Sequence, residues 1–269
     1  MRWLVVGASG HLGGEVARLA SAAGAEVHGT STTGGSWSRL DITDRAAVRA
    51  LVAAVRPAVV VNAAYRADSW AICADGAAHV ALAAAEAGAR LVHVSSDAVH
   101  GGRPEPYPDD AAPTPVYPYG AAKAAAEAAV AAIDPAAVVV RTSLIVGDER
   151  SKQVRFVLDL AAGRARGALF TDMVRCPVDA GDLAAAILEL AAAGYAGRIN
   201  VAGPQAVTRA ELGRLVAARY GLDRAAVPVG PIAEGGVAAG PAEIRLDSSR
   251  AAGLLSTPLR GVREALGGA

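Results

Sequence analysis

A glycine-rich turn near the N-terminus constrains the fold more than any other feature of this sequence. Gly7, Gly10 and Gly13 form a G-x-x-G-x-x-G pattern directly after the apolar run at residues 3–6. Such a turn lets the backbone approach a pyrophosphate closely, and the first N–H groups of the following helix stabilise the phosphate charge. The spacing alone is weak evidence in a chain with 30 glycines. Its position between a buried strand and a helical pattern favours a dinucleotide site over a glycine turn without a ligand.

Apolar runs alternate with helical patterns along the first half of the chain. Extended runs are predicted near residues 3–6, 25–28, 58–61, 91–94 and 138–140, with helical patterns between them. This order predicts repeated βαβ units and a parallel sheet, with right-handed crossovers that place helices on both faces. The expected fold is α/β, a Rossmann-type doubly wound parallel sheet with a smaller C-terminal substrate-binding lobe.

The division of the chain follows from this pattern. We expect residues 1–148 to form the dinucleotide-binding Rossmann domain. Residues 149–269 would mainly form the substrate-binding lobe, with some segments returning to the first domain. Gly and Pro become denser between Pro228 and Pro241, where irregular structure is expected.

Composition excludes several classes of protein. Hydrophobic residues make up 53% of the chain and the formal net charge is zero, which indicates a large core and argues against nucleic acid as the main partner. The apolar stretches are short or interrupted, so no membrane-spanning segment is expected. Cys73 and Cys176 are the two cysteines, and no signal peptide precedes them, which favours a reduced cytoplasmic compartment.

The end of the second extended run bears on the choice of dinucleotide. Proteins that prefer NAD usually place an acidic residue there to bind the adenosine ribose, whereas this chain has Thr30 and Ser31 within a stretch without acids. Hydroxyl groups can donate to a 2′-phosphate, and Arg39 is near enough in sequence to reach it. NADP(H) is therefore favoured over NAD(H), although an ordinary Ser/Thr loop explains the stretch equally well.

Tyr119 and Lys123 form the second candidate motif. They stand four residues apart in a helical pattern and so share one face. A nearby lysine charge favours the phenolate and would lower the pKa of Tyr119 toward the working range. Ser95 and Ser96 follow the fourth extended run, at the strand ends where ligands bind in open parallel sheets. The alternative for Tyr119 and Lys123 is a pair of side chains on a helix surface. The alternative for Ser95 and Ser96 is an ordinary turn.

Taken together, the order of these motifs resembles that of the extended short-chain dehydrogenase/reductases. The segments 40–44 (LDITD), 61–64 (VNAA), 93–97 (HVSSD), 141–143 (RTS) and 245–249 (RLDSS) narrow the resemblance to the dTDP-4-dehydrorhamnose reductase branch. It covers essentially the whole chain. Such enzymes transfer a hydride from NAD(P)H to a keto carbon of a nucleotide-linked sugar, and a tyrosine protonates the oxygen.

The resemblance assigns roles to individual residues. Ser96 would polarise the substrate carbonyl, Tyr119 would be the general acid, and Lys123 would bind the nicotinamide ribose and tune Tyr119. Asp97, Ala98, His100 and Arg175 would face the substrate. The cofactor would be bound by Gly7, Ser9, Gly10, His11, Leu12, Gly13, Thr30, Ser31, Arg39, Asp41, Ile42, Ala63, Ala64, Tyr65, Ser95, Tyr119 and Lys123.

The substrate side departs from the family pattern. Ala98, Val99 and His100 stand where aromatic residues usually follow the Ser-x-Asp motif, which leaves the identity of the sugar open. Arg175 is of interest because a guanidinium binds a diphosphate in bidentate fashion. An ion pair with Asp172 or Asp179 is the competing explanation for Arg175.

The sequence leaves three functions open. No nucleophile elbow or clustered zinc-ligand spacing is present, so a serine hydrolase and a metal site are not expected. The first function is a reductase of a dTDP-4-keto-6-deoxyhexose. The others are a nucleotide-sugar epimerase or dehydratase and a non-catalytic NADP-binding regulatory subunit, since the regulatory subunit of methionine adenosyltransferase resembles the same branch. A homodimer is one expectation for the oligomeric state, although the Ala-rich helices fit an internal position equally well.

Overall fold

The computed structural model describes residues 1–234 and 240–267, and its centre is a seven-stranded sheet. Its strand order is β11-β6-β5-β4-β1-β2-β3 and every neighbouring pair is parallel. The strands are β1 (Arg2–Val6), β2 (Glu26–Ser31), β3 (Ser38–Arg39), β4 (Val59–Asn62), β5 (Arg90–Val94), β6 (Val138–Arg141) and β11 (Gly197–Asn200). The predicted doubly wound parallel sheet is confirmed.

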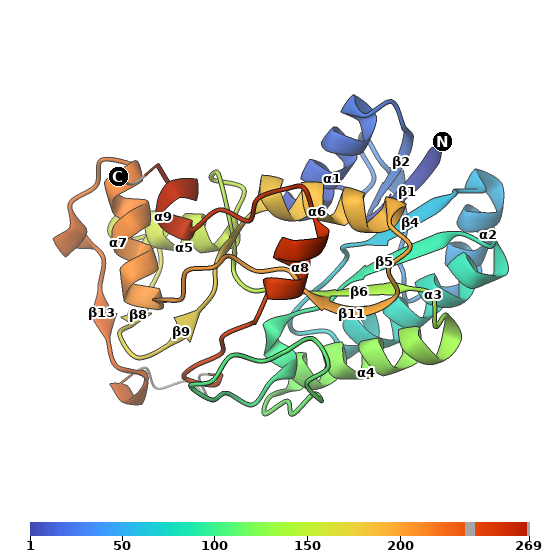
Figure 1. Ribbon diagram of the computed structural model, residues 1–269. Coiled ribbons are helices and arrows are strands. Elements are labelled where there is room, and N and C mark those ends of the chain that lie inside the picture. The colour runs from blue at the N-terminus through green and yellow to red at the C-terminus, as the bar shows by residue number, and fades with distance from the viewer. Residues whose placement is uncertain (235–239, 268–269) are drawn as a thin grey trace.

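Helices cover both faces of this sheet (Figure 1). One face carries α1 (His11–Ala22) and α6 (Ala180–Ala192), and the other carries α2 (Arg45–Val55), α3 (Gly76–Glu86) and α4 (Pro118–Ile133). The central strands are apolar without alternation because both of their faces are buried. The Asp44 carboxylate caps α2 by accepting from the Ala47 N–H, and the helix ends at Val55, before Pro57.

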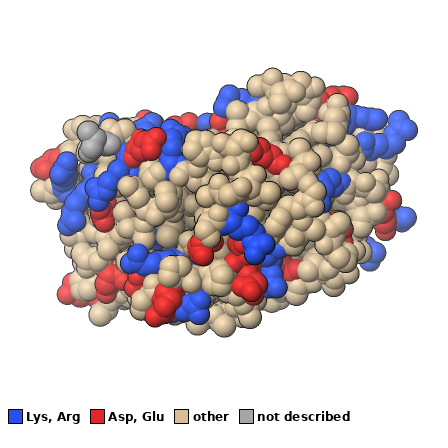
Figure 2. All heavy atoms as spheres, in the orientation of Figure 1, with Lys and Arg blue, Asp and Glu red and all other residues tan. Residues whose placement is uncertain are grey.

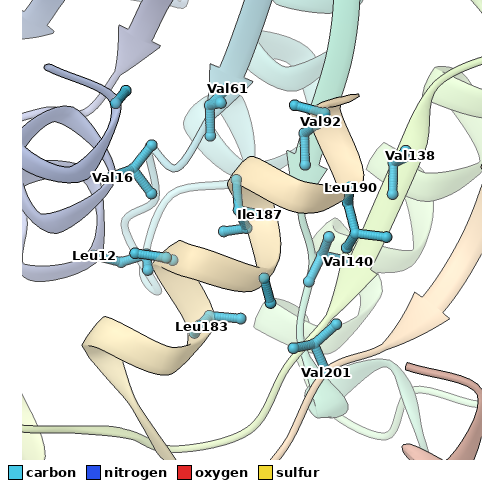
Figure 3. Close-up of a cluster of buried hydrophobic side chains, with 14 of the residues drawn as sticks. Leu12, Val16, Val61, Val92, Val138, Val140, Leu183, Ile187, Leu190 and Val201 are labelled. Atoms are coloured by element: carbon cyan, nitrogen blue, oxygen red, sulfur yellow. The ribbon is translucent and has the colours of Figure 1, made fainter. Parts of the chain in front are cut away.

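The core between the sheet and α6 positions the N-terminus of α1. Leu183, Ile187 and Leu190 of α6 belong to one cluster with the sheet valines, and Leu12 and Val16 of α1 complete it on the side of Leu183 and Ile187 (Figure 3). All three α6 side chains are fully buried. Burying a leucine or isoleucine contributes about 1.5–3 kcal/mol relative to exposure, so this layer holds α1 rigidly against the strand ends.

A second cluster of elements lies beyond the C-terminal edge of the sheet (Figure 1). Here α5 (Lys152–Ala161), α7 (Arg209–Arg219) and α9 (Val262–Ala265) enclose a separate hydrophobic cluster. Three two-stranded sheets pair β7 (Ile145–Val146) with β10 (Val178–Asp179), β9 (Val174–Arg175) with β12 (Val207–Thr208), and β8 (Leu169–Phe170) with β13 (Val229–Gly230). The remaining short elements are α8 (Ser249–Leu254), a π-helical turn η1 (Ala71–Asp75), and the 3₁₀ turns η2 (Asp97–Val99), η3 (Arg224–Ala226) and η4 (Ile232–Glu234).

The stretch expected to be irregular holds only two short elements, β13 and η4, in its described part. Residues 235–239 of that stretch lie outside the described residues. Acidic and basic side chains are interspersed over the face drawn in Figure 2. Among the residues described, no helix has the length and apolar character needed to cross a bilayer.

Candidate active site

The glycine turn fits a pyrophosphate because side chains would block it. Gly7 has a φ of +87°, and a Cβ added there would lie 2.9 Å from the Ala64 nitrogen. A Cβ on Gly13 would lie 2.2 Å from the Gly7 carbonyl oxygen. Gly10 is the N-cap of α1 and makes no side-chain capping bond, so N–H groups of the first helical turn are available to an anion. The turn therefore has the shape and polarity that a dinucleotide phosphate requires.

A cleft of about 1600 Å³ runs from this turn along the strand ends to the second cluster of elements. Most residues predicted to bind cofactor or substrate line it. They are Gly7, Ser9, Gly10, His11, Leu12, Gly13, Thr30, Ser31, Asp41, Ile42, Ala63, Ala64, Tyr65, Ser95, Ser96, Asp97, Ala98, Tyr119, Lys123 and Arg175. The two motifs separated by more than a hundred residues thus meet in one cleft.

Two predicted residues do not line this cleft. Arg39 lies exposed on the edge strand β3, next to Leu40 of the cleft wall, and its contact with a cofactor phosphate stays a prediction. His100 is fully buried, and its ring stacks on Tyr107 with centroids 3.9 Å apart. Burial lowers the pKa of His100 to about 3. The prediction that His100 faces the substrate is wrong, because the chain leaving η2 turns this side chain into the protein.

Ser95 and Ser96 point to different sides of the strand end. The Ser95 hydroxyl donates to Glu127 Oε1 at 2.6 Å inside the protein, so the predicted cofactor contact of Ser95 would fall to its backbone. Ser96 is half-buried, and its Oγ accepts from the Ala98 N–H at 3.2 Å. Successive side chains of an extended segment alternate between faces, and this separates the two serines.

Tyr119 lies in the first turn of α4 beside Ser96. Burial raises the pKa of Tyr119, and a hydrogen bond with Ser96 offsets only part of that effect. The predicted lowering of this pKa by Lys123 is therefore not found in the cofactor-free protein. The Lys123 Nζ instead lies 2.6 Å from the Val94 carbonyl oxygen and 3.2 Å from His93 Nε2. Burial lowers the pKa of Lys123 to about 8.

Asp97 and Arg175 form a buried pair at the substrate end of the cleft. Arg175 Nε lies 3.7 Å from Asp97 Oδ2, and Ser143 donates to the same oxygen at 2.7 Å. Burial raises the pKa of Asp97 despite these partners. Arg175 also donates to the carbonyl oxygens of Val174 at 2.7 Å and Pro241 at 2.8 Å. The carboxylate that pairs with Arg175 is therefore Asp97, and not Asp172 or Asp179 as in the competing explanation.

Several cleft residues were not predicted from the sequence. Trp37 lines the cleft, and Asn62 and His93 are buried behind Lys123 without lining it. A set of basic side chains lines the part of the cleft nearest α5 and α7. These are Arg150, Lys152, Arg155, Arg166 and Arg209. Arg209 is bonded to Gln153, and burial together with Arg175 lowers its pKa to about 10. These residues belong to no short motif, so only the fold brings them together.

Comparisons with known proteins agree with this site. The family described as RmlD substrate binding domain matches residues 1–269. A dTDP-4-dehydrorhamnose reductase of Mycolicibacterium smegmatis is 35% identical over 280 residues, covering 98% of this chain and 84% of the relative. A dTDP-4-keto-6-deoxy-D-glucose reductase of Streptomyces niveus is 31% identical over 278 residues, covering 96% of this chain and 93% of the relative.

Two solved structures of similar fold carry the same family description. The dTDP-4-dehydrorhamnose reductase of Bacillus anthracis in complex with NADP aligns with a TM-score of 0.86 and 26% identity, covering 98% of this chain and 96% of that one. A protein of Sulfolobus tokodaii described as a hypothetical dTDP-4-dehydrorhamnose reductase aligns with a TM-score of 0.85 and 30% identity, covering 97% of each chain. The protein therefore belongs to the dTDP-4-dehydrorhamnose reductase branch of the extended short-chain dehydrogenase/reductases.

Proposed function

We propose that the protein is an NAD(P)H-dependent reductase of a keto group on a nucleotide-linked sugar, of the dTDP-4-keto-6-deoxyhexose type. The observation that carries this proposal is the single cleft lined both by the glycine turn and by Ser96, Tyr119 and Lys123. Hydride transfer to a carbonyl needs a bound dinucleotide beside hydrogen-bond donors for the carbonyl oxygen, and this cleft offers both. Family membership supports the same activity.

The chain's own residues would act on the carbonyl oxygen. The bound cofactor would supply the hydride. Ser96 would donate a hydrogen bond to that oxygen, and Tyr119 would transfer its phenolic proton to it as the carbon is reduced. The raised pKa of Tyr119 supports this role, because it keeps the group protonated, as a general acid must be before reaction. Lys123 would hold the nicotinamide ribose.

NADPH is the proposed cofactor in preference to NADH. The strand β2 ends in Thr30 and Ser31, and Thr32 follows it on the cleft wall. None of these residues carries a carboxylate, which would repel a 2′-phosphate. The Ser31 hydroxyl is bonded to Gly34, so we assign the phosphate contact to Thr32 and to the backbone around it. An NADH affinity above that for NADPH in a fluorescence titration would contradict this preference.

The basic part of the cleft supports a substrate that carries a diphosphate. Arg209 and the exposed arginines of this region surround the space beyond Tyr119, and Asp97 and Glu234 are the acidic groups near them. We assign diphosphate binding to Arg209 together with Arg175, whose guanidinium also positions Asp97. Asp97 and Ala98 would then contact the sugar. An unchanged KM for the nucleotide sugar in both Arg175→Ala and Arg209→Ala would refute this assignment.

The decisive experiment follows NADPH oxidation by absorbance with a panel of dTDP-4-keto-6-deoxyhexoses. We expect turnover with at least one sugar, and a fall in kcat of about 10²–10⁴-fold in Tyr119→Phe, the range found for general acids. Sugar conversion without net NADPH consumption would indicate an epimerase or dehydratase instead. NADPH binding without turnover of any sugar would favour a regulatory subunit.

A further inference from the structure

Lys123 lies at the end of a row of buried, hydrogen-bonded side chains. The proposed reduction gives the other two residues of this row no role. Asn62 and His93 are register partners on the neighbouring strands β4 and β5, and Lys123 faces them from α4. Asn62 Nδ2 lies 3.3 Å from His93 Nδ1, and His93 Nε2 lies 3.2 Å from Lys123 Nζ. Each of the three side chains is no more than 1% exposed. Their hydrogen bonds must therefore be satisfied among themselves and the backbone.

The direction of these hydrogen bonds follows from the backbone. The Ala64 N–H donates to Asn62 Oδ1 at 3.2 Å, which fixes the orientation of the amide. The Asn62 NH₂ group therefore faces His93 Nδ1, and that nitrogen must act as an acceptor. Burial lowers the pKa of His93 well below its usual value, so its ring is neutral and carries one proton. That proton is on Nε2, which then donates toward Lys123.

A lysine side chain can accept this hydrogen bond only as an amine, because an ammonium group has no lone pair. We propose that Asn62 and His93 stabilise the neutral amine form of Lys123 in the cofactor-free protein, so that cofactor binding at alkaline pH makes it take up a proton. The amine accepts from His93 Nε2 and donates to the Val94 carbonyl. An ammonium group would donate to His93 Nε2, so the ring proton would have to be on Nδ1. There two donors would meet, the Nδ1–H and the Asn62 NH₂ group.

The acidic groups around Lys123 favour its charged form too weakly to offset its burial. Glu127, one turn along α4, is bonded to Arg141 at 2.7 Å and accepts from Ser95. Cys73 of η1 and Tyr119 one turn earlier are the remaining titratable neighbours. Burial lowers the pKa of Lys123 to about 8, although Cys73 and Glu127 both act to raise it. The hydrogen-bond direction imposed by Asn62 and His93 favours the amine further.

The second half of the inference rests on the proposed function. Ribose hydroxyl oxygens at Lys123 would accept hydrogen bonds and favour the ammonium form. The amine nitrogen would then form a new N–H bond with a proton from solvent, and the complex would gain one positive charge. Because the complex binds the extra proton, cofactor affinity should be constant below the free Lys123 pKa. Above that pKa it should fall, by up to about tenfold per pH unit.

The tautomer of His93 tests the first half without any cofactor. The free protein is labelled with ¹⁵N-histidine and measured by NMR at pH 9, with His93→Gln used to identify the resonances. We expect a neutral ring with its proton on Nε2. A proton on Nδ1 would mean that Nε2 accepts from an ammonium, and would overturn the proposal.

Proton uptake tests the second half. NADP⁺ binding is measured calorimetrically at pH 9 in two buffers of different ionisation enthalpy. Tyr119→Phe is the background, so that ionisation of the phenol does not contribute. A free pKa near 8 gives an uptake of about 0.9 proton per cofactor. Adding Lys123→Met should abolish this uptake.

The His93→Gln variant in the same background separates this role from a purely structural one. A glutamine can present its side-chain oxygen to an ammonium, so Lys123 should keep its proton in the free protein and the uptake should fall. Binding without proton uptake in the parent variant would refute the inference. Absence of any binding heat would contradict the cofactor assignment instead, and the tautomer measurement would still decide the state of Lys123.

Discussion

Replacing Gly13 with alanine should damage cofactor binding far more than folding. The added Cβ would lie 2.2 Å from the Gly7 carbonyl oxygen and 2.8 Å from its carbonyl carbon. A normal carbon–oxygen contact is more than 3 Å, so the turn and the start of α1 must move apart by roughly 1 Å. These are the backbone groups assigned to the pyrophosphate. A displacement of this size weakens an interaction that depends on correct positioning by about 100-fold.

The expected result is a Kd for NADPH about 100-fold higher, equivalent to about 2.7 kcal/mol. The free energy of unfolding should fall by about 1–3 kcal/mol, the usual cost of overpacking. Fluorescence titration gives the first quantity and urea denaturation the second. Gly253→Ala is the control, because an added Cβ there meets nothing within 4 Å. A Kd for Gly13→Ala within threefold of the parent protein would show that the turn does not contact the phosphates.

Two further predictions concern buried polar groups. Arg141→Met leaves the Glu127 carboxylate buried without its partner. It should lower the free energy of unfolding in urea by about 3–5 kcal/mol, and adding Glu127→Gln should restore part of the loss. An unchanged free energy of unfolding in Arg141→Met would show that the ion pair does not contribute to stability. His100 is neutral when folded because burial lowers its pKa to about 3. The unfolded chain therefore binds more protons below about pH 6.5, and stability falls as the pH is lowered through that range. His100→Phe should reduce this loss in acid denaturation and leave the substrate KM unchanged. A tenfold change in KM would show that His100 does contact the substrate.

The elements of the site that the sequence predicted are those in which chemistry requires particular residues at a fixed local spacing. The turn from Gly7 to Gly13 and the Tyr119–Lys123 pair are of this kind, and both line the cleft. Helix α1 likewise follows the apolar pattern, and its chain reverses at Gly24, which has a φ of +82°. Local rules are sufficient to predict such features because the residue types that define each one lie within one helical turn or one loop.

The partners of these residues could not be predicted in the same way. Asn62 and His93 meet because β4 and β5 pair in one register, and no local pattern specifies which residues of two distant strands are neighbours. Arg209 reaches the cleft from α7, far along the chain from the glycine turn. His100 illustrates a third cause, since its direction depends on how the chain leaves η2.

The position of α4 shows why buried polar contacts matter in this protein. The helix carries Tyr119 and Lys123, yet most of its other residues are alanines, which fit a buried and an exposed face about equally well. Apolar burial therefore does little to fix its rotation against the sheet. Two polar contacts fix the rotation of α4 instead, those of Lys123 with His93 and of Glu127 with Ser95. Each contact forms in one orientation of the helix only. Arg141→Met should therefore lower kcat as well as stability, and adding Glu127→Gln should restore part of the stability without restoring kcat. Full recovery of both would show that small-residue packing alone orients the helix.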